Sequence, residues 1–350
     1  MNIHEKYMLR CIELGEKGLG GTAPNPMVGC VIVSNQKIIG EGYTSPYGGP
    51  HAEVNAINSV EDKKLLLKAT LYVTLEPCSH FGQTPPCTDL ILKHAIPKVI
   101  IGLQDPHDKV AGKGIKKLRA SECKVTVGVL EADCRAHHKR FLSFQEKKRP
   151  YIVLKWAETK DGFVAPDKTQ RKDVPEPFWI SNTYSKQLVH KWRTEEQAIL
   201  VGTNTILEDN PKLTARNWEG NHPIRVILDR DLRVPSDFHV LDKSVETIVL
   251  TQTDDASSYE NGITYELIDF SQPIARQICE VLYRHSITSI LVEGGTKTLQ
   301  TFIDSGLWDE ARIFRGTTLF QKGITAPKIS GKHSGNVSIL SDTLSIFAND

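Results

Sequence analysis

The sequence predicts an α/β protein built from two domains. Its 350 residues exceed what a single hydrophobic core usually supports. Helix and strand patterns alternate along the chain, which is typical of α/β layers. A charged stretch that ends in proline, residues 146–150, separates two such patterns and is the best linker candidate. We therefore expect one domain over residues 1–145 and a second over residues 151–350.

In the first domain, helix and strand patterns follow one another closely. Residues 3–15 carry apolar side chains on one helical face, and a loop rich in Gly and Pro follows. Two apolar runs separated by Ser-Asn-Gln predict a β-hairpin. The predicted elements are helix 3–15, strands 29–33 and 37–42, helix 51–60, strand 70–75, helix 88–94, strand 98–103, helix 115–120 and strand 124–129. This order predicts a sheet covered by helices on both faces.

The second domain shows the same kind of alternation. Strands are predicted at 151–156, 198–201, 224–228, 247–251 and 289–292, and helices at 184–193, 274–284 and 298–305. Ser181 or Asn182 is placed to cap the first of these helices. We therefore expect a second α/β unit after the linker.

The charge balance favours a small-molecule substrate over a nucleic acid. The chain has 43 Lys and Arg against 42 Asp and Glu, so it lacks the basic surplus of nucleic-acid-binding proteins. No apolar run approaches the roughly 20 residues of a membrane span. Residues 1–20 resemble an amphipathic helix rather than a secretory signal. Seven scattered cysteines indicate a reducing cytoplasm, with two of them available for a metal.

His51, Glu53, Cys78 and Cys87 form the pattern of a catalytic zinc site. One imidazole and two thiolates leave a fourth tetrahedral position for water. Glu53 lies two residues after a ligand, where it can take a proton from that water and pass it on. Alternatively, His51 caps a helix and the cysteines are small core residues. The Pro-Cys at a strand end and a second Cys at the next helix start favour the metal.

The cysteine spacing departs from the general signature of zinc nucleobase deaminases. That signature places two residues between the cysteines, whereas eight separate Cys78 from Cys87. Both must reach one ion, so residues 79–86 should form a compact loop.

A strand that runs into Gly294 and Gly295 is the main binding signal of the second domain. Such a turn exposes backbone N–H groups at a helix N-terminus, which suits a phosphate. A plain tight turn explains two glycines equally well, and the Gly-x-Gly-x-x-Gly fingerprint of a Rossmann fold is missing.

Several segments closely resemble one family, the bifunctional riboflavin-biosynthesis deaminase/reductases. In the first domain they are residues 23–29 (Ala-Pro-Asn-Pro-Met-Val-Gly), 49–53 (Gly-Pro-His-Ala-Glu), 75–87, 105–107 and 110–114. In the second they are residues 155–162, 179–181, 201–205, 209–216 and 292–295. The eight-residue gap between the cysteines is also what this family shows.

For the first domain the resemblance implies a cytidine-deaminase-like three-layer fold. It implies hydrolytic deamination of 2,5-diamino-6-ribosylamino-4(3H)-pyrimidinone 5′-phosphate. The zinc ligands would be His51, Cys78 and Cys87, Glu53 would shuttle protons, and Asn25 would contact substrate.

For the second domain it implies a dihydrofolate-reductase-like α/β fold that reduces the ribosyl group of the deaminated product with NADPH. The implied NADPH contacts are Ala157, Trp179, Thr205, Asp209 and Gly295, with Arg230 nearby. The implied sugar-phosphate contacts are Arg193, Leu213, Arg216 and Glu293. The two arginines would clamp a phosphate with forked donors, although a single Arg is more often a solvated cation, and Trp179 would equally suit a core.

Four positions depart from the family pattern. Gln83 stands where a basic residue is frequent and Thr44 where a His is frequent, which leaves the deaminase phosphate contact to His80, Lys109 or Lys113. Trp156 is bulkier than usual, and Pro177 replaces a Ser that often contacts substrate.

We expect Zn²⁺ and NADPH as cofactors and pyrimidine ribosyl phosphates as substrates, with no nucleic-acid or membrane partner. A homo-oligomer is compatible with the sequence. Three alternatives stay open: a deaminase with a degenerate reductase half, a nucleic-acid-editing zinc deaminase, and a non-enzymatic zinc module.

Overall fold

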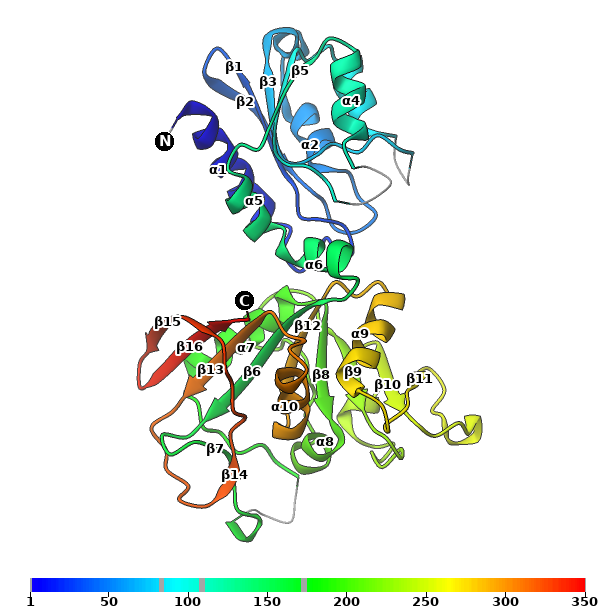
Figure 1. The fold of residues 1–350 in the computed structure, drawn as a ribbon, viewed down its shortest axis with the longest axis vertical. Helices are drawn as coiled ribbons and strands as arrows, with labels where there is room; N and C mark the ends of the chain where they lie inside the picture. Colours follow the sequence, from blue (N-terminus) through cyan, green and yellow to red (C-terminus); the bar gives the residue numbers. More distant parts are fainter. Residues whose placement is uncertain (1, 82–84, 107–110, 171–174, 350) are drawn as a thin grey trace. The chain divides into compact units, whose positions relative to one another are not determined.

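The computed structural model describes residues 2–81, 85–106, 111–170 and 175–349. The chain forms two compact units, Met1–Lys148 and Arg149–Asp350 (Figure 1). None of the helices in the described part of the chain combines the length and apolar character that crossing a bilayer demands.

The first unit contains a five-stranded mixed sheet. Its order is β2 (Lys37–Tyr43), β1 (Gly29–Ser34), β3 (Thr70–Leu75), β4 (Lys98–Leu103) and β5 (Lys124–Val127). Strand β1 runs antiparallel to both neighbours, whereas β3, β4 and β5 are parallel. The predicted hairpin is confirmed. Its turn residues Asn35 and Gln36 have φ of 49° and 63°, the left-handed backbone that two-residue hairpins require.

Helices cover both faces of this sheet. Helices α1 (Ile3–Glu16) and α5 (Glu131–His137) contact each other on one face. Helices α2 (Ala52–Ser59), α3 (Cys87–Lys93) and α4 (Lys113–Ala120) form a contiguous layer on the other (Figure 1). The helix α6 (Lys139–Lys147) and the short helix η1 (Lys63–Lys68) complete the unit. This is the three-layer fold that the resemblance implies.

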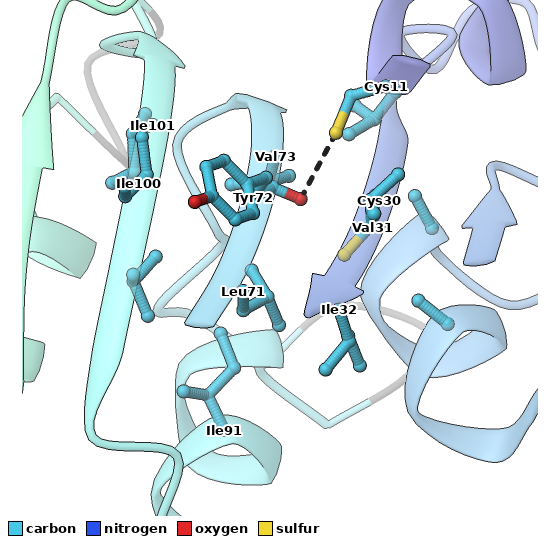
Figure 2. Packing of buried hydrophobic residues seen from close by; sticks show 14 of the residues in the cluster. Cys11, Cys30, Val31, Ile32, Leu71, Tyr72, Val73, Ile91, Ile100 and Ile101 are labelled. Carbon is cyan, nitrogen blue, oxygen red and sulfur yellow. Dashed lines mark hydrogen bonds between the residues drawn. The ribbon is translucent and has the colours of Figure 1, made fainter. Parts of the chain in front are cut away.

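The central strands of the first unit are apolar along their whole length. Successive side chains point to opposite faces, and helices cover both faces, so every residue of β1 is buried. Val31, Ile32, Leu71 and Val73 are fully buried (Figure 2). Burying side chains of this size contributes about 1.5–3 kcal/mol each. On the α1 side, the Cys11 Sγ donates to the Tyr72 carbonyl at 3.5 Å.

The second unit contains a nine-stranded sheet. Its order is β11 (Thr264–Leu267), β10 (Thr247–Thr251), β9 (Ile224–Leu228), β8 (Ala198–Gly202), β12 (Ser289–Gly294), β6 (Tyr151–Glu158), β13 (Glu310–Arg315), β16 (Asp342–Ala348) and β15 (Lys332–Ile339). The strands from β11 to β13 are parallel, and β16 is antiparallel to both its neighbours. Strands β7 (Phe163–Pro166) and β14 (Gly323–Thr325) form a separate ribbon.

Helices also cover both faces of the second sheet. Helices α7 (Thr183–Glu195) and α8 (Thr203–Asp209) pack on one face, and α9 (Ile274–Arg284) and α10 (Thr296–Asp304) on the other. Short helices η2 (Lys168–Gln170), η3 (His239–Leu241) and η4 (Ala256–Ser258) lie in connecting loops. The dihydrofolate-reductase-like α/β arrangement is confirmed. Of the two candidate caps of α7, Asn182 is the one used, since its side chain accepts from two backbone N–H groups of the first turn.

The linker predicted over residues 146–150 is wrong in extent. Glu146 belongs to the last turn of α6 and pairs with Arg135 at 2.8 Å. Arg149 is buried and forms a two-pronged ion pair with Asp309 of the second unit. Two of the four charged residues of this segment, Glu146 and Arg149, therefore have ion-pair partners.

Candidate active sites

His51, Cys78 and Cys87 come together at one end of the first sheet. His51 occupies the N-cap position of α2 without a side-chain capping bond, Cys78 follows β3, and Cys87 is the first residue of α3. The His51 Nδ1 lies 3.6 Å from the Cys78 Sγ and 3.3 Å from the Cys87 Sγ, and all three ligand atoms lie within 4.8 Å of one another. Tetrahedral zinc with ordinary bond lengths needs nitrogen–sulfur separations of about 3.5 Å. The donor set and its spacing therefore fit zinc.

The local hydrogen bonds prepare Cys78 to act as a thiolate. Its Sγ accepts the Cys87 backbone N–H at 3.3 Å. Hydrogen bonds from the Cys87 thiol and the His51 ring lower the pKa of Cys78 to about 4. Metal ligation requires the deprotonated thiol, so this environment prepares Cys78 as a ligand, while the same hydrogen bond raises the pKa of Cys87.

Glu53 lies in the first turn of α2 and is 4% exposed. Its burial and the charge of Cys78 raise the pKa of Glu53 to about 7. It is not among the three candidate ligands. A carboxyl beside three ligands, rather than bound as a fourth, is suited to proton transfer.

Glu76 is a structural anchor of this site that the sequence did not assign. Its buried carboxylate accepts the backbone N–H groups of Asp105, Gly112 and Ile115 at 3.3, 2.9 and 3.1 Å. These bonds tie the segment that leads to Cys78 to the loop before α4 and to the first turn of that helix. The sequence feature that could have identified this residue is a Glu directly before the Pro-Cys of the zinc pattern.

The remaining candidates of the first domain have different surroundings. Asn25 lies in the loop before β1, and its N–H donates to the Thr22 carbonyl at 2.9 Å. The buried Thr44 hydroxyl accepts the Val28 N–H at 3.0 Å, so it serves the fold. His80 and Lys113 are exposed. Gln83 and Lys109 lie outside the described residues, so the phosphate contact of this domain stays a prediction.

The second unit holds a cavity of about 1150 Å³ at the carboxyl ends of its parallel strands. Ligands of open α/β sheets bind at this edge. The structure brings every candidate of this domain to its wall: Ala157, Trp179, Arg193, Thr205, Asp209, Leu213, Arg216, Arg230, Glu293 and Gly295. The lining contains eight Lys or Arg and four Asp or Glu, which favours anionic ligands.

Of the two arginines of the predicted phosphate clamp, Arg193 and Arg216, Arg193 is already bound to other groups of the protein. The Arg193 Nε and Nη2 donate to the Glu293 carboxylate at 2.8 and 2.9 Å, and its Nη1 donates to the Thr214 carbonyl at 3.1 Å. The fork that was expected to hold a phosphate therefore holds Glu293. Arg216 is exposed and has no hydrogen-bond or ion-pair partner among the described residues, so it is the available cation of the pair.

Lys155 is a candidate functional residue that sequence reasoning missed. Its Nζ lies 3.7 Å from Glu293, and its side chain is 15% exposed and lines the cavity. Burial lowers the pKa of Lys155. Burial alone would raise the pKa of Glu293, but the positive charges of Arg193 and Lys155 outweigh it and lower that pKa to about 2. A lone lysine within the apolar run 151–156 was the available signal.

The turn from β12 into α10 lies beside these charges. Gly294 has φ of +133°, a backbone that suits only glycine, and Gly295 is the N-cap of α10. The helix begins at Thr296, two residues earlier than predicted, so its N-terminal N–H groups adjoin the cavity.

The aromatic and basic candidates occupy other parts of the wall. Trp179 is 54% exposed and lies under the Lys186 Nζ at 4.5 Å, so it is not a core residue. Arg230 pairs with its neighbour Asp231 at 2.9 Å. Trp156 is buried, and its indole N–H donates to Glu158 at 3.0 Å. Pro177 also lines the cavity.

Comparisons with known proteins agree with this two-site arrangement. Residues 1–103 match the cytidine and deoxycytidylate deaminase zinc-binding region, and residues 150–331 match the RibD C-terminal domain. The riboflavin biosynthesis protein RibD of Aquifex aeolicus is 38% identical over 92% of this chain and 89% of its own length.

Two solved structures also resemble the chain. One is the diaminohydroxyphosphoribosylaminopyrimidine deaminase/5-amino-6-(5-phosphoribosylamino)uracil reductase of Thermotoga maritima, with a TM-score of 0.89, 38% identity and 99% of both chains covered. The other is RibD of Acinetobacter baumannii, with a TM-score of 0.90, 30% identity and the same coverage.

Proposed function

Because the chain belongs to the RibD family of riboflavin biosynthesis proteins, we propose that each of its two sites performs one of the family's two reactions. The protein is a bifunctional enzyme with deaminase and reductase activities, and its cofactors are Zn²⁺ and NADPH. Deamination of 2,5-diamino-6-ribosylamino-4(3H)-pyrimidinone 5′-phosphate is assigned to the first unit. NADPH-dependent reduction of 5-amino-6-(5-phosphoribosylamino)uracil is assigned to the second. The convergence of ten reductase candidates on one basic cavity is the observation that carries the assignment of an intact second site.

In the deaminase site, His51, Cys78 and Cys87 would hold the zinc. When bound, zinc lowers the pKa of water towards neutrality. Glu53 would take one proton from the attacking water and pass it to the ring nitrogen. It would then take the proton of the newly formed C–OH group and pass it to the amine, which leaves as ammonia when the C–N bond breaks. Asn25 contacts the substrate, and Glu76 keeps the segment that carries Cys78 in place.

In the reductase site, NADPH would be held by Ala157, Trp179, Thr205, Asp209, Arg230 and Gly295, and when bound it would supply the hydride. The N-terminus of α10 suits a phosphate group of that cofactor. Arg216 holds the substrate phosphate and Leu213 packs beside it. Lys155 and Glu293 are placed to bond the opened ribose, and Arg193 orients Glu293.

The zinc assignment predicts one tightly held ion per chain. Cys78→Ser or Cys87→Ser removes a ligand that the site needs. We expect both variants to lose zinc in elemental analysis after dialysis, whereas Cys123→Ser keeps it, because the Cys123 Sγ donates to the Ile96 carbonyl at 3.4 Å and is not part of the ligand group. Full zinc retention in both ligand variants would contradict the assignment.

An intact second site predicts two separable half-reactions in the purified protein. Ammonia release from the diamino substrate should occur without NADPH, and NADPH absorbance should fall when the deaminated sugar phosphate is supplied. Ammonia release with no NADPH oxidation would instead identify a deaminase with a degenerate reductase half.

We also propose that the enzyme works in the reducing cytoplasm on small-molecule substrates and without nucleic acid. None of the seven cysteines, all of them among the described residues, forms a disulfide, which supports a reducing compartment. A homo-oligomer is compatible with this assignment, and size-exclusion chromatography with light scattering tests it.

A further inference from the structure

The loop of residues 209–216, here called the 209–216 loop, forms one wall of the reductase cavity. It contributes Lys212, Leu213 and Arg216 to the lining. Its backbone is unusual, because Asn210 and Leu213 have φ of 36° and 55°. Residues other than glycine enter this left-handed region at a cost and stay there only where surrounding groups hold them.

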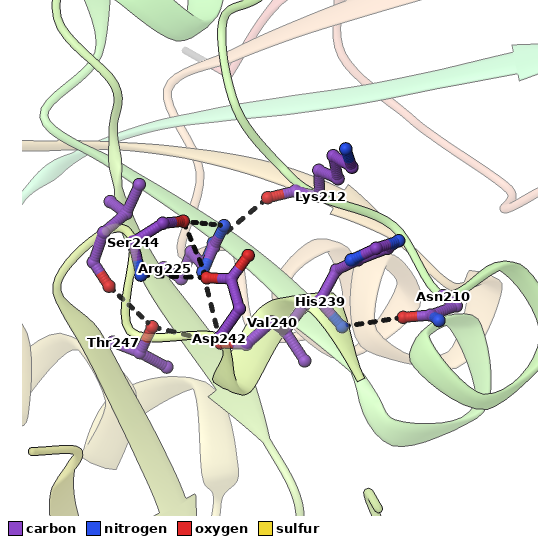
Figure 3. A network of polar contacts seen from close by, with 9 residues as sticks. Asn210, Lys212, Arg225, His239, Val240, Asp242, Ser244 and Thr247 are labelled. Carbon is purple, nitrogen blue, oxygen red and sulfur yellow. Dashed lines mark hydrogen bonds and ion pairs between the residues drawn. The ribbon is translucent and has the colours of Figure 1, made fainter. Parts of the chain in front are cut away.

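Arg225 binds this loop but does not itself line the cavity. It lies on β9 and is fully buried. Its Nε donates to the Lys212 carbonyl at 3.0 Å, the residue before Leu213 (Figure 3). Its Nη1 donates to Asp242 at 2.7 Å, and its Nη2 donates to the Ser244 hydroxyl at 3.2 Å.

A second hydrogen bond also joins the 209–216 loop to the segment of residues 239–244. The Asn210 side chain accepts the His239 backbone N–H at 2.9 Å, at the start of η3 (Figure 3). The 209–216 loop is therefore fastened to residues 239–244 at Asn210 and, through the Arg225 guanidinium, at Lys212. On its other side, the Arg193 Nη1 binds the Thr214 carbonyl.

A buried guanidinium is not needed merely to fill this space. An apolar residue of similar volume often serves a core equally well, because it avoids desolvating a charge. Arg225 supplies what an apolar residue lacks, namely several donors in a fixed planar fork. One of these donors fixes a backbone carbonyl directly before the strained Leu213.

We propose that Arg225 is a positioning residue of the reductase site. Without contacting ligand, it fixes the 209–216 loop so that Leu213 and Arg216 face the sugar phosphate. This inference rests on the proposed assignment of the second unit as the reductase.

The test measures KM and kcat for reduction of the deaminated sugar phosphate in Arg225→Met. A displacement of about 1 Å at a substrate-positioning group costs on the order of 10²-fold. We therefore expect KM to rise roughly ten- to hundredfold, with a smaller change in kcat, because Lys155 and Glu293 lie outside the loop. Arg225→Lys, which retains one donor, should recover part of the affinity.

Arg149→Met is the matched control. Arg149 is also buried and forms an ion pair with Asp309, in which its Nη2 lies 2.8 Å from the Asp309 Oδ1. It does not line the cavity. Its loss should lower thermal stability, as the loss of Arg225 should, but leave KM near the wild-type value. All variants are assayed below their unfolding temperatures. If Arg225→Met does not fold, Ser244→Ala and Asp242→Asn remove single partners and should raise KM by smaller factors.

An unchanged KM in folded Arg225→Met would overturn the proposal, as would an equal rise in Arg149→Met. Failure of the wild-type protein to oxidise NADPH would instead overturn the assignment of the second unit. The two failures are therefore distinguishable.

Discussion

Replacing Glu53 with Gln should reduce deamination by about 10²–10⁴-fold while the protein keeps its zinc. The amide has nearly the same shape but cannot accept and return a proton. The three ligand atoms belong to His51, Cys78 and Cys87, so the metal site itself is unchanged. Ammonia release measures the loss, and elemental analysis measures the zinc.

Glu13→Gln is the control, since Glu13 lies on α1 of the same unit with a side chain 62% exposed and should leave deamination unchanged. The Glu53→Gln protein should also oxidise NADPH normally when supplied with deaminated substrate, because no residue of the first unit is assigned to the reductase site. Deamination within about tenfold of wild type would rule out the proton shuttle, and loss of reduction would indicate a shared site.

The predicted strands 70–75 and 98–103 match β3 and β4 at both ends. Their apolar runs are buried on both faces of a parallel sheet, and this produces a continuous signal. Helices α5 and α6 were not predicted, because their buried positions include Cys134, His137 and Ser143 rather than a clear apolar stripe. Strand β15 was missed for a related reason, since most of its side chains are exposed.

Prediction of the site residues was limited to features that leave a local pattern in the sequence. The zinc ligands could be predicted because the chemistry of the metal restricts both residue type and spacing. Arg193 and Glu293 are 100 positions apart in the sequence. Only the fold reveals that their side chains form an ion pair with each other. The family resemblance therefore named both residues as contacts of the sugar phosphate, but it did not reveal their pairing with each other.

The two arginines should respond differently to removal. Arg193→Ala leaves Glu293, whose side chain is 9% exposed, without its two-pronged partner. Breaking a buried pair in this way costs about 3–5 kcal/mol of unfolding free energy, and the misplaced carboxylate should lower kcat/KM for reduction by on the order of 10²-fold. Arg216 is exposed and unpaired among the described side chains, so Arg216→Ala should change stability by no more than about 0.5 kcal/mol.

For Arg216→Ala we expect the loss to appear in KM for the sugar phosphate. A charge-assisted hydrogen bond contributes about 1.5–3 kcal/mol, which corresponds to a rise of roughly ten- to hundredfold. Urea unfolding measures the free energies, and NADPH absorbance with the deaminated substrate measures the kinetics. Deamination and zinc content should stay at wild-type levels in both variants.

A double variant separates stability from activity at the Arg193–Glu293 pair. Arg193→Met with Glu293→Leu removes both charges together, so no unpaired carboxylate remains and apolar side chains fill the site. Such replacements are often neutral or stabilising, so the double variant should recover most of the stability that Arg193→Ala loses. It should not recover reduction, because the carboxylate that faces Lys155 is gone. If Arg193→Ala were as stable as wild type and raised KM as Arg216→Ala does, Arg193 would be half of a phosphate clamp after all.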